Sequence, residues 1–241
     1  IWNLHAIGTH WPDRLTGIEV SDINGDGRPD VITGGYSGGS RDQDDDIDLA
    51  AAMGRLAWFE HPGDLILDWT RHDISRRKRG MFDKFVPRDM DGDGDLDMVL
   101  PNGGRVWLND GNGVFYTEFV GSDVRDGASI ALGDIDEDGH LDIVTTVDYY
   151  VPTRHEVAVQ LGIGNGFGNP GPVFMVNIGG GSPAVVALSD MNGDEHLDLL
   201  TLNQATGNIS LLLGAGDGSF GAPMVFAAHT AGNFVPNVFV V

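Results

Sequence analysis

Short apolar runs alternate with acidic, glycine-containing loops along this chain, and the alternation occurs four times. An apolar run precedes each loop, and a run rich in β-branched or aliphatic residues follows it. The preceding runs are Gly17–Val20, Phe85–Pro87, Ser129–Leu132 and Ala184–Leu188, and the following runs are Val31–Thr33, Met98–Leu100, Ile143–Thr146 and Leu199–Leu202. Apolar runs of this length between turn residues are typical of β-strands.

Each repeat contains a third predicted strand and a closing turn with an aromatic residue behind it. The third strands are Arg55–Phe59, Arg105–Leu108, Glu156–Gln160 and Ile209–Leu213. The turns are Gly111–Gly113, Gly164–Gly166 and Gly216–Gly218, followed by Phe115, Phe167 and Phe220, and Trp69 takes the aromatic place in the first repeat. Asn-Gly and Asp-Gly turns supply the positive φ that tight hairpins require. Each repeat is therefore predicted to be a four-stranded antiparallel meander, which is typical of a propeller blade.

We predict an all-β fold, a β-propeller or propeller fragment forming a single domain over residues 1–241. Its four complete blades are expected at about 17–78, 82–120, 128–177 and 183–228. Partial blade strands are expected at 1–10 and 229–241, because Trp2–Ile7 is similar to Trp69–Ile74 and Asn233–Val241 is similar to an opening strand. Such ends leave open sheet edges. We therefore expect a piece of a larger propeller, or a subunit whose edges other chains cover.

The four acidic loops share one nine-residue pattern, D-x-[DN]-x-D-[GE]-x-x-D. They begin at Asp22, Asp89, Asp134 and Asp190. Side chains at positions 1, 3, 5 and 9 and a carbonyl at position 7 would place several hard oxygens around one cation, as Ca²⁺ prefers. A solvated turn is the alternative for one such loop, but four copies in register argue against it. An EF-hand fits less well, because the twelfth position is not Glu; it holds Thr33, Leu100, Thr145 and Thr201.

The net charge changes which partners are expected. The chain has 36 acidic and 14 basic residues, a formal charge of −22, and 17 of the acids lie in the four loops. This excess disfavours nucleic acid and anionic membrane surfaces as partners. No apolar run approaches the ~18 residues of a spanning helix, so membrane insertion is not expected. The absence of Cys excludes disulfides, thiolate metal sites and a Cys nucleophile.

Loop, turn and aromatic strand together resemble the FG-GAP/VCBS repeats, the blades of integrin α-subunit propellers and of many bacterial extracellular proteins. Phe220–Pro223 nearly spells the name motif, Phe167–Pro170 is a weaker echo, and the resemblance covers about residues 17 to 228. It implies one Ca²⁺ per loop, about four in all. The implied side-chain ligands are Asp22, Asn24, Asp26, Asp30, Asp89, Asp91, Asp93, Asp97, Asp134, Asp136, Asp138, Asp142, Asp190, Asn192, Asp194 and Asp198. The implied position-7 carbonyls are those of Arg28, Asp95, His140 and His196.

Three features depart from the regular repeat. Glu195 stands where the sixth loop position is otherwise Gly, and we expect it to strain the turn and weaken that site. The insertion Tyr36–Met53 carries an acidic cluster that is a solvated loop, a further calcium site or a partner contact. The basic run Arg76–Arg79 is either a contact for an acidic partner or a soluble connection between blades.

The sequence predicts a calcium-binding extracellular module for adhesion or for recognition of a protein or glycan. Extracellular modules bind Ca²⁺ at ~10⁻⁴–10⁻³ M, so we expect a secreted, surface-attached or periplasmic protein. Trp11, Tyr149 and Tyr150 are candidates for stacking on sugar rings.

Two alternative functions remain open: the propeller domain of a carbohydrate-active enzyme of lyase or dehydratase type, and a structural subunit of an extracellular assembly. We predict no catalytic residue. The G-x-S-x-G match at Gly35–Gly39 lacks the following helix that a nucleophile elbow requires.

Overall fold

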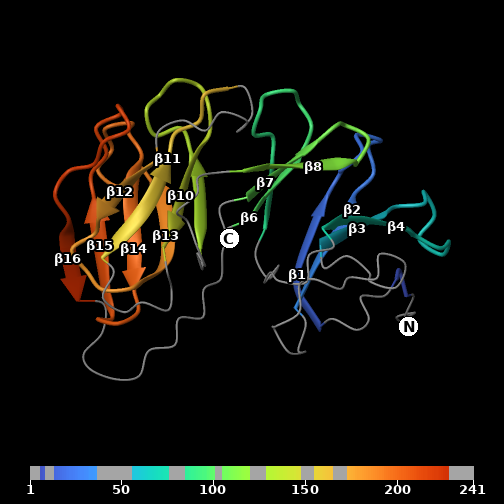
Figure 1. Cartoon of the computed structure of the whole chain (residues 1–241), viewed down its shortest axis with the longest axis horizontal. Helices are drawn as coiled ribbons and strands as arrows, with labels where there is room; N and C mark the ends of the chain where they lie inside the picture. Colours follow the sequence, from blue (N-terminus) through green and yellow to red (C-terminus); the bar gives the residue numbers. More distant parts are fainter. Residues whose placement is uncertain are drawn as a thin grey trace. The chain divides into compact units, whose positions relative to one another are not determined.

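The computed structural model describes residues 6–8, 14–36, 56–75, 85–100, 105–119, 129–147, 155–164 and 173–227. Within these ranges the regular structure is entirely β-strand, and the strands form four antiparallel sheets of four (Figure 1). The predicted all-β propeller with four-stranded blades is thereby confirmed. This part of the chain contains no helix long and apolar enough to cross a bilayer.

Several predictions fall outside the described residues. They concern most of the two terminal partial strands, the insertion after Tyr36 and the basic run Arg76–Arg79, together with the aromatic candidates Trp11, Tyr149 and Tyr150.

The chain divides into two compact units, and blades 1 and 2 make up most of the first. Both blades are simple meanders in which each strand pairs with the next along the chain. The strands of blade 1 are β1 (Arg14–Ser21), β2 (Asp30–Tyr36), β3 (Leu56–Glu60) and β4 (Thr70–Ser75). The strands of blade 2 are β5 (Val86–Arg88), β6 (Asp97–Leu100), β7 (Arg105–Asn109) and β8 (Phe115–Phe119).

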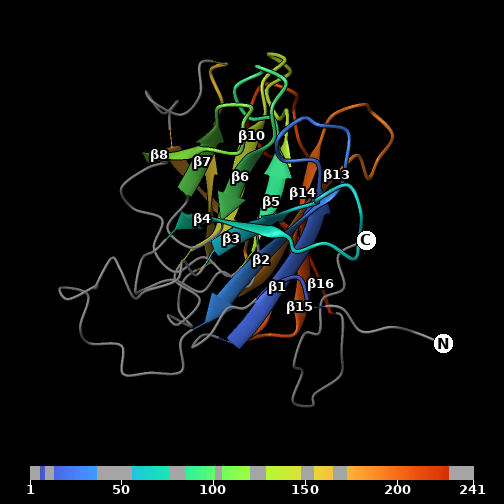
Figure 2. The ribbon, with the colours of Figure 1, turned by 90° about the vertical axis from the view of Figure 1, so that its right-hand side faces the viewer.

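Blades 3 and 4 make up most of the second unit and have the same meander order. Figure 2 labels all four strands of blade 4. The strands of blade 3 are β9 (Ile130–Gly133), β10 (Asp142–Thr146), β11 (Glu156–Gln160) and β12 (Val173–Asn177). The strands of blade 4 are β13 (Pro183–Ser189), β14 (Asp198–Asn203), β15 (Asn208–Leu212) and β16 (Met224–Ala227).

The closing strand of blade 4 begins later than the aromatic residue predicts. Phe220 lies before β16 and pairs with Gly214 only as an isolated bridge. Its side chain packs against the core of the second unit. Pro223 has no N–H to donate to a ladder, so regular pairing resumes only at Met224.

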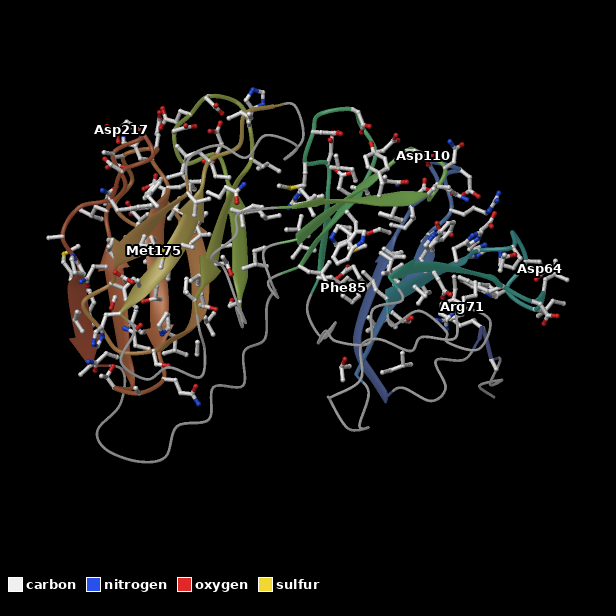
Figure 3. All side chains as sticks on the ribbon, in the orientation of Figure 1. Asp64, Arg71, Phe85, Asp110, Met175 and Asp217 are labelled. Carbon is white, nitrogen blue, oxygen red and sulfur yellow. The ribbon has the colours of Figure 1, made fainter. Side chains whose placement is uncertain are left out.

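Within each unit, the core lies between the facing surfaces of its two blades. In the first unit, Phe85 just before β5 joins this core, and Figure 3 labels its position. The buried members of the first core are Ile23, Ile32, Leu56, Trp58, Phe85, Met98, Leu100 and Trp107. Those of the second are Ile135, Val144, Val157, Val159, Ile178, Val186, Leu199 and Leu212. In both cores, most side chains come from the apolar runs that flank an acidic loop and from the third strand of a blade.

A fully buried aspartate begins the second strand of every blade. This ninth loop residue is Asp30, Asp97, Asp142 or Asp198, and each is 0% exposed. Burial of a carboxylate is costly unless it accepts hydrogen bonds. In each blade its Oδ1 accepts an N–H from the residue at or just after the end of the third strand. The donor-to-oxygen distances are 2.8 Å from His61, 2.9 Å from Asn109, 2.7 Å from Gly162 and 2.9 Å from Gly214.

The second carboxylate oxygen of the same aspartate accepts a hydrogen bond from the backbone of the acidic loop. Oδ2 accepts the N–H of the second loop residue in blades 1, 3 and 4. The distances are 3.0 Å from Ile23, 2.6 Å from Ile135 and 2.8 Å from Met191. The aspartate is the first residue of the second strand, and its carboxylate therefore connects the start of the acidic loop with the end of the third strand.

We expect replacement of Asp198 by Ala to destabilise the fold strongly. The N–H groups of Met191 and Gly214 would lose their acceptor, which costs about 3 kcal/mol for two such groups. Urea unfolding in chelator should measure this loss, because no bound ion then contributes. The control is Asp68→Ala, which removes one exposed carboxylate. Equal stability of the two variants would contradict the role of Asp198.

Candidate metal centres

The first aspartate of each loop folds the loop back on itself. In loop 3, Asp134 accepts the N–H groups of Asp138 at 3.1 Å and Gly139 at 2.9 Å. In loop 1, Asp22 accepts the equivalent N–H groups at 3.0 and 2.8 Å. In loops 2 and 4 the N–H of the sixth residue makes the same bond to the first aspartate. Gly94 donates to Asp89 at 3.1 Å, and Glu195 donates to Asp190 at 3.0 Å. The nine-residue pattern therefore gives the same local turn in all four blades.

The fifth residue makes a second recurrent bond. Its Oδ1 accepts the N–H of position 7 in every loop, an Asx turn in which the side chain bonds the backbone two residues on. The distances are 2.9 Å in loops 1, 2 and 3 and 3.0 Å in loop 4. Positions 1, 3, 5 and 7 are thus brought around one small volume by local bonding alone.

The loop backbone enters the left-handed region at positions 4 and 6. Glycine serves there in most cases, for example Gly25 at φ 70° and Gly27 at φ 84°. Two glutamates occupy these positions instead, Glu137 at φ 58° and Glu195 at φ 74°. Side chains with a Cβ are strained in this region. The strain expected at Glu195 therefore agrees with its observed backbone, and the weaker site stays a prediction.

Carboxylate oxygens converge in loops 2 and 3. One ligand atom from each of three acids lies within 4.8 Å of the others, in the sets Asp89, Asp91 and Asp97, and Asp134, Asp136 and Asp138. Oδ1 of Asp136 is a buried atom with no hydrogen-bond partner among the described residues. Such an atom is costly to leave bare. Three hard anionic oxygens with a free buried acceptor fit a divalent cation, and these residues would hold it.

The electrostatics of loop 3 point to the same need for positive charge. Burial raises the pKa of the Asp136 carboxyl, and the neighbouring charge of Asp138 raises it further. Burial likewise raises the pKa of Asp142 to about 6, against the opposing effect of two backbone hydrogen bonds. A cation bound in the loop would favour the charged form of each group.

Loops 1 and 4 are arranged differently, and no set of three converging acids is found in their described residues. Both carry Asn at position 3. In loop 1 the carboxylate of Asp26 forms an ion pair with the guanidinium of Arg28. In loop 4 the Asn192 amide donates to Asp194 Oδ2 at 2.7 Å. Part of the predicted ligand set is therefore engaged by neighbours within the loop. Whether these residues bind metal stays a prediction for all four loops.

A contact between loops 3 and 4 was missed from the sequence. Glu137 Oε1 is hydrogen-bonded to His196 Nδ1, which joins position 4 of one loop to position 7 of the next. The bond to Glu137 raises the pKa of His196. A signal was present, because position 4 is Gly in the other three loops.

One segment of the four-bladed fold is similar to a known repeat family. Residues 89–145, from loop 2 into β10, match the family model of the FG-GAP-like repeat. The match and the four blades together support an FG-GAP repeat propeller. No curated protein matches the sequence.

A solved structure with a similar fold is that of an Agrocybe aegerita lectin, described by its specific recognition of non-reducing terminal N-acetylglucosamine. The TM-score is 0.55 at 17% identity, over 87% of this chain and 51% of the lectin chain. This chain therefore spans about half the length of the lectin, and the similarity shows the fold alone.

We expect Glu195→Gly to stabilise the protein by about 1 kcal/mol, because Gly adopts the left-handed φ without a Cβ penalty. Thermal or urea unfolding measures the gain. The matched variant Glu195→Ala removes the same carboxylate but keeps the Cβ, so it should gain little. An equal gain in both variants would mean that charge, and not backbone strain, limits this loop.

We expect the raised pKa of Asp142 to make stability depend on pH in ion-free buffer. A carboxyl with a higher pKa in the folded protein prefers to be protonated there. The free energy of unfolding should therefore fall as pH rises from about 4 to about 6, and then level off. Urea unfolding over this range, compared with Asp142→Asn, isolates the contribution of this group. A slope that persists unchanged in the variant would refute the assignment.

Proposed function

We propose that this chain is a calcium-binding, extracellular propeller module that recognises a ligand, with a glycan as the first ligand to test. The observation that carries the proposal is the convergence of three carboxylates in each of loops 2 and 3. Bare carboxylates at such separations repel one another, and a bound cation removes the repulsion.

Calcium is the proposed ion because of the donor set. The loops offer aspartate and asparagine oxygens and a backbone carbonyl, and Ca²⁺ accepts six to eight such ligands in flexible geometry. Mg²⁺ demands a near-ideal octahedron and retains its water, so crowded carboxylates suit it poorly. We propose one ion per loop, about four in all, with Glu195 weakening the fourth.

Recognition of a glycan is supported by the fold. The similar solved chain is a lectin described as recognising non-reducing terminal N-acetylglucosamine. The acidic loops are fixed by repeated hydrogen bonds, and loops on a rigid scaffold commonly carry binding residues. A protein ligand for adhesion is the other form of the same proposal.

An extracellular, cell-surface or periplasmic location follows from the proposed ion. Extracellular calcium modules bind at ~10⁻⁴–10⁻³ M and would stay empty at cytosolic calcium levels. Bound calcium would also stabilise the folded blades by mass action.

We expect Asp136→Asn to weaken one calcium site on the order of tenfold, because it removes one ligand charge from loop 3. Calorimetric titration with Ca²⁺ measures the affinities, and native mass spectrometry counts the ions. Asp68→Asn is the control, with the same change at an exposed position outside the loops. A wild-type chain that binds no Ca²⁺ would refute the calcium part of the proposal.

The ligand is tested on a panel of glycans and polysaccharides with Ca²⁺ present and again after chelation. Calcium-dependent binding of an intact glycan supports a recognition module. A cleaved ligand would instead establish the carbohydrate-active enzyme. Failure to bind any glycan would overturn glycan recognition and leave a protein ligand.

A further inference from the structure

Loop 3 departs from the other three loops at its fourth position. Gly25, Gly92 and Gly193 occupy that position in loops 1, 2 and 4, and each has a positive φ. Loop 3 has Glu137 there instead, at φ 58°. A residue with a Cβ is strained in this region and persists only where the surrounding structure fixes its conformation. We therefore expect the Glu137 side chain to make an interaction that offsets the strain.

The side chain of Glu137 makes such an interaction with the next blade. Its Oε1 is hydrogen-bonded to Nδ1 of His196, the seventh residue of loop 4. The backbone N–H of His196 donates to Asp194 Oδ1 at 3.0 Å, so the imidazole extends from a loop that is itself held. Loops 3 and 4 belong to the same compact unit. The bond therefore joins loop 3 of blade 3 to blade 4.

The turn between β15 and β16 of blade 4 lies against this bond. A Cβ at Gly216 would be 2.5 Å from His196 Nδ1 and 2.7 Å from Glu137 Oε1, so glycine leaves the space that the pair occupies. Two residues further on, the N–H of Gly218 donates to the carbonyl oxygen of Ile135 at 3.3 Å. Loop 3 is thus fixed to blade 4 at its second and its fourth residue.

The third residue of loop 3, Asp136, lies between these two points. It is one of three acids whose carboxylate oxygens converge, and its Oδ1 is buried without a hydrogen-bond partner among the described residues. Without a cation, repulsion between the three carboxylates favours an open loop. Glu137 stands between two of these acids in the chain, so an open loop would separate it from His196. The bond to blade 4 therefore opposes the opening.

We propose that His196 and Glu137 are positioning residues for the cation site of loop 3, and that blade 4 thereby raises the calcium affinity of blade 3. Neither side chain belongs to the converging set of loop 3. A loop that is held in its binding geometry before the ion arrives loses less binding energy to ordering. By reciprocity, an ion in loop 3 strengthens the bond between the blades. This inference rests on the proposed calcium binding of loop 3.

The test compares Glu137→Ala with Glu137→Gln by calorimetric titration with Ca²⁺. Both variants lose the same charge and keep a Cβ at the strained position, but only Gln retains an oxygen that can bond to His196. Asp136→Asn identifies the titration step that belongs to loop 3. At that step, Glu137→Ala should bind Ca²⁺ about threefold more weakly than Glu137→Gln, the size expected for a half-exposed pair.

His196→Ala tests the same bond from the other blade. It should also weaken the loop 3 step, although His196 belongs to loop 4. The double variant Glu137→Ala/His196→Ala should bind no more weakly at this step than Glu137→Ala alone, because both changes remove one bond. The control His72→Ala removes a comparable bond to Glu60, at 2.9 Å in blade 1, and should leave the loop 3 step unchanged.

Circular dichroism and thermal melting show whether each variant is folded. If His196→Ala is not, the two Glu137 variants carry the test alone, because the Glu137 side chain is 52% exposed. Equal affinity of Glu137→Ala and Glu137→Gln at loop 3, in a protein whose wild type binds Ca²⁺, would overturn this inference alone. A wild type that binds no Ca²⁺ would instead overturn the calcium part of the proposed function, and this inference with it.

Discussion

The buried carboxylate at the ninth loop position is the interaction on which each blade depends. It begins the second strand and accepts an N–H from beyond the third, so one side chain sets the spacing of the loop and two strands. Its position in the fold is expensive unless both oxygens are satisfied. The acidic pattern is thus a folding signal in its own right, independent of the proposed metal binding.

Some carboxylates that stabilise the fold also belong to the candidate metal sites. Asp97 accepts the Asn109 N–H and also belongs to the converging carboxylates of loop 2. A carboxylate has about four lone-pair sites, so accepting a hydrogen bond does not by itself prevent coordination of a cation. Loop 3 has the strongest need for a cation, because Asp136 keeps an oxygen without a partner among the described residues.

The sequence predicted the repeat, the meander and the central strands, because each acidic loop is followed directly in the chain by an apolar, mostly β-branched run. It did not predict the late start of β16, which depends on where Phe220 packs and on Pro223. The bond between Glu137 and His196 joins residues 59 positions apart, so the exceptional Glu at the fourth loop position marks one partner but no local pattern identifies the other. Leu200 and Val144 are both apolar and stand at the same place in their strands, yet Val144 is fully buried and Leu200 half-buried, which the local pattern does not indicate.

The two ends of each blade differ in how much length they tolerate. The acidic connections between first and second strands are eight residues long in all four blades, as the clamping aspartate requires. The connections between second and third strands, at the opposite end, are 19, 4, 9 and 4 residues long. Among the four blades of this chain, the connections at one end therefore differ in length while those at the other end are the same. That variable end is where a foreign peptide could be grafted without disturbing the carboxylates.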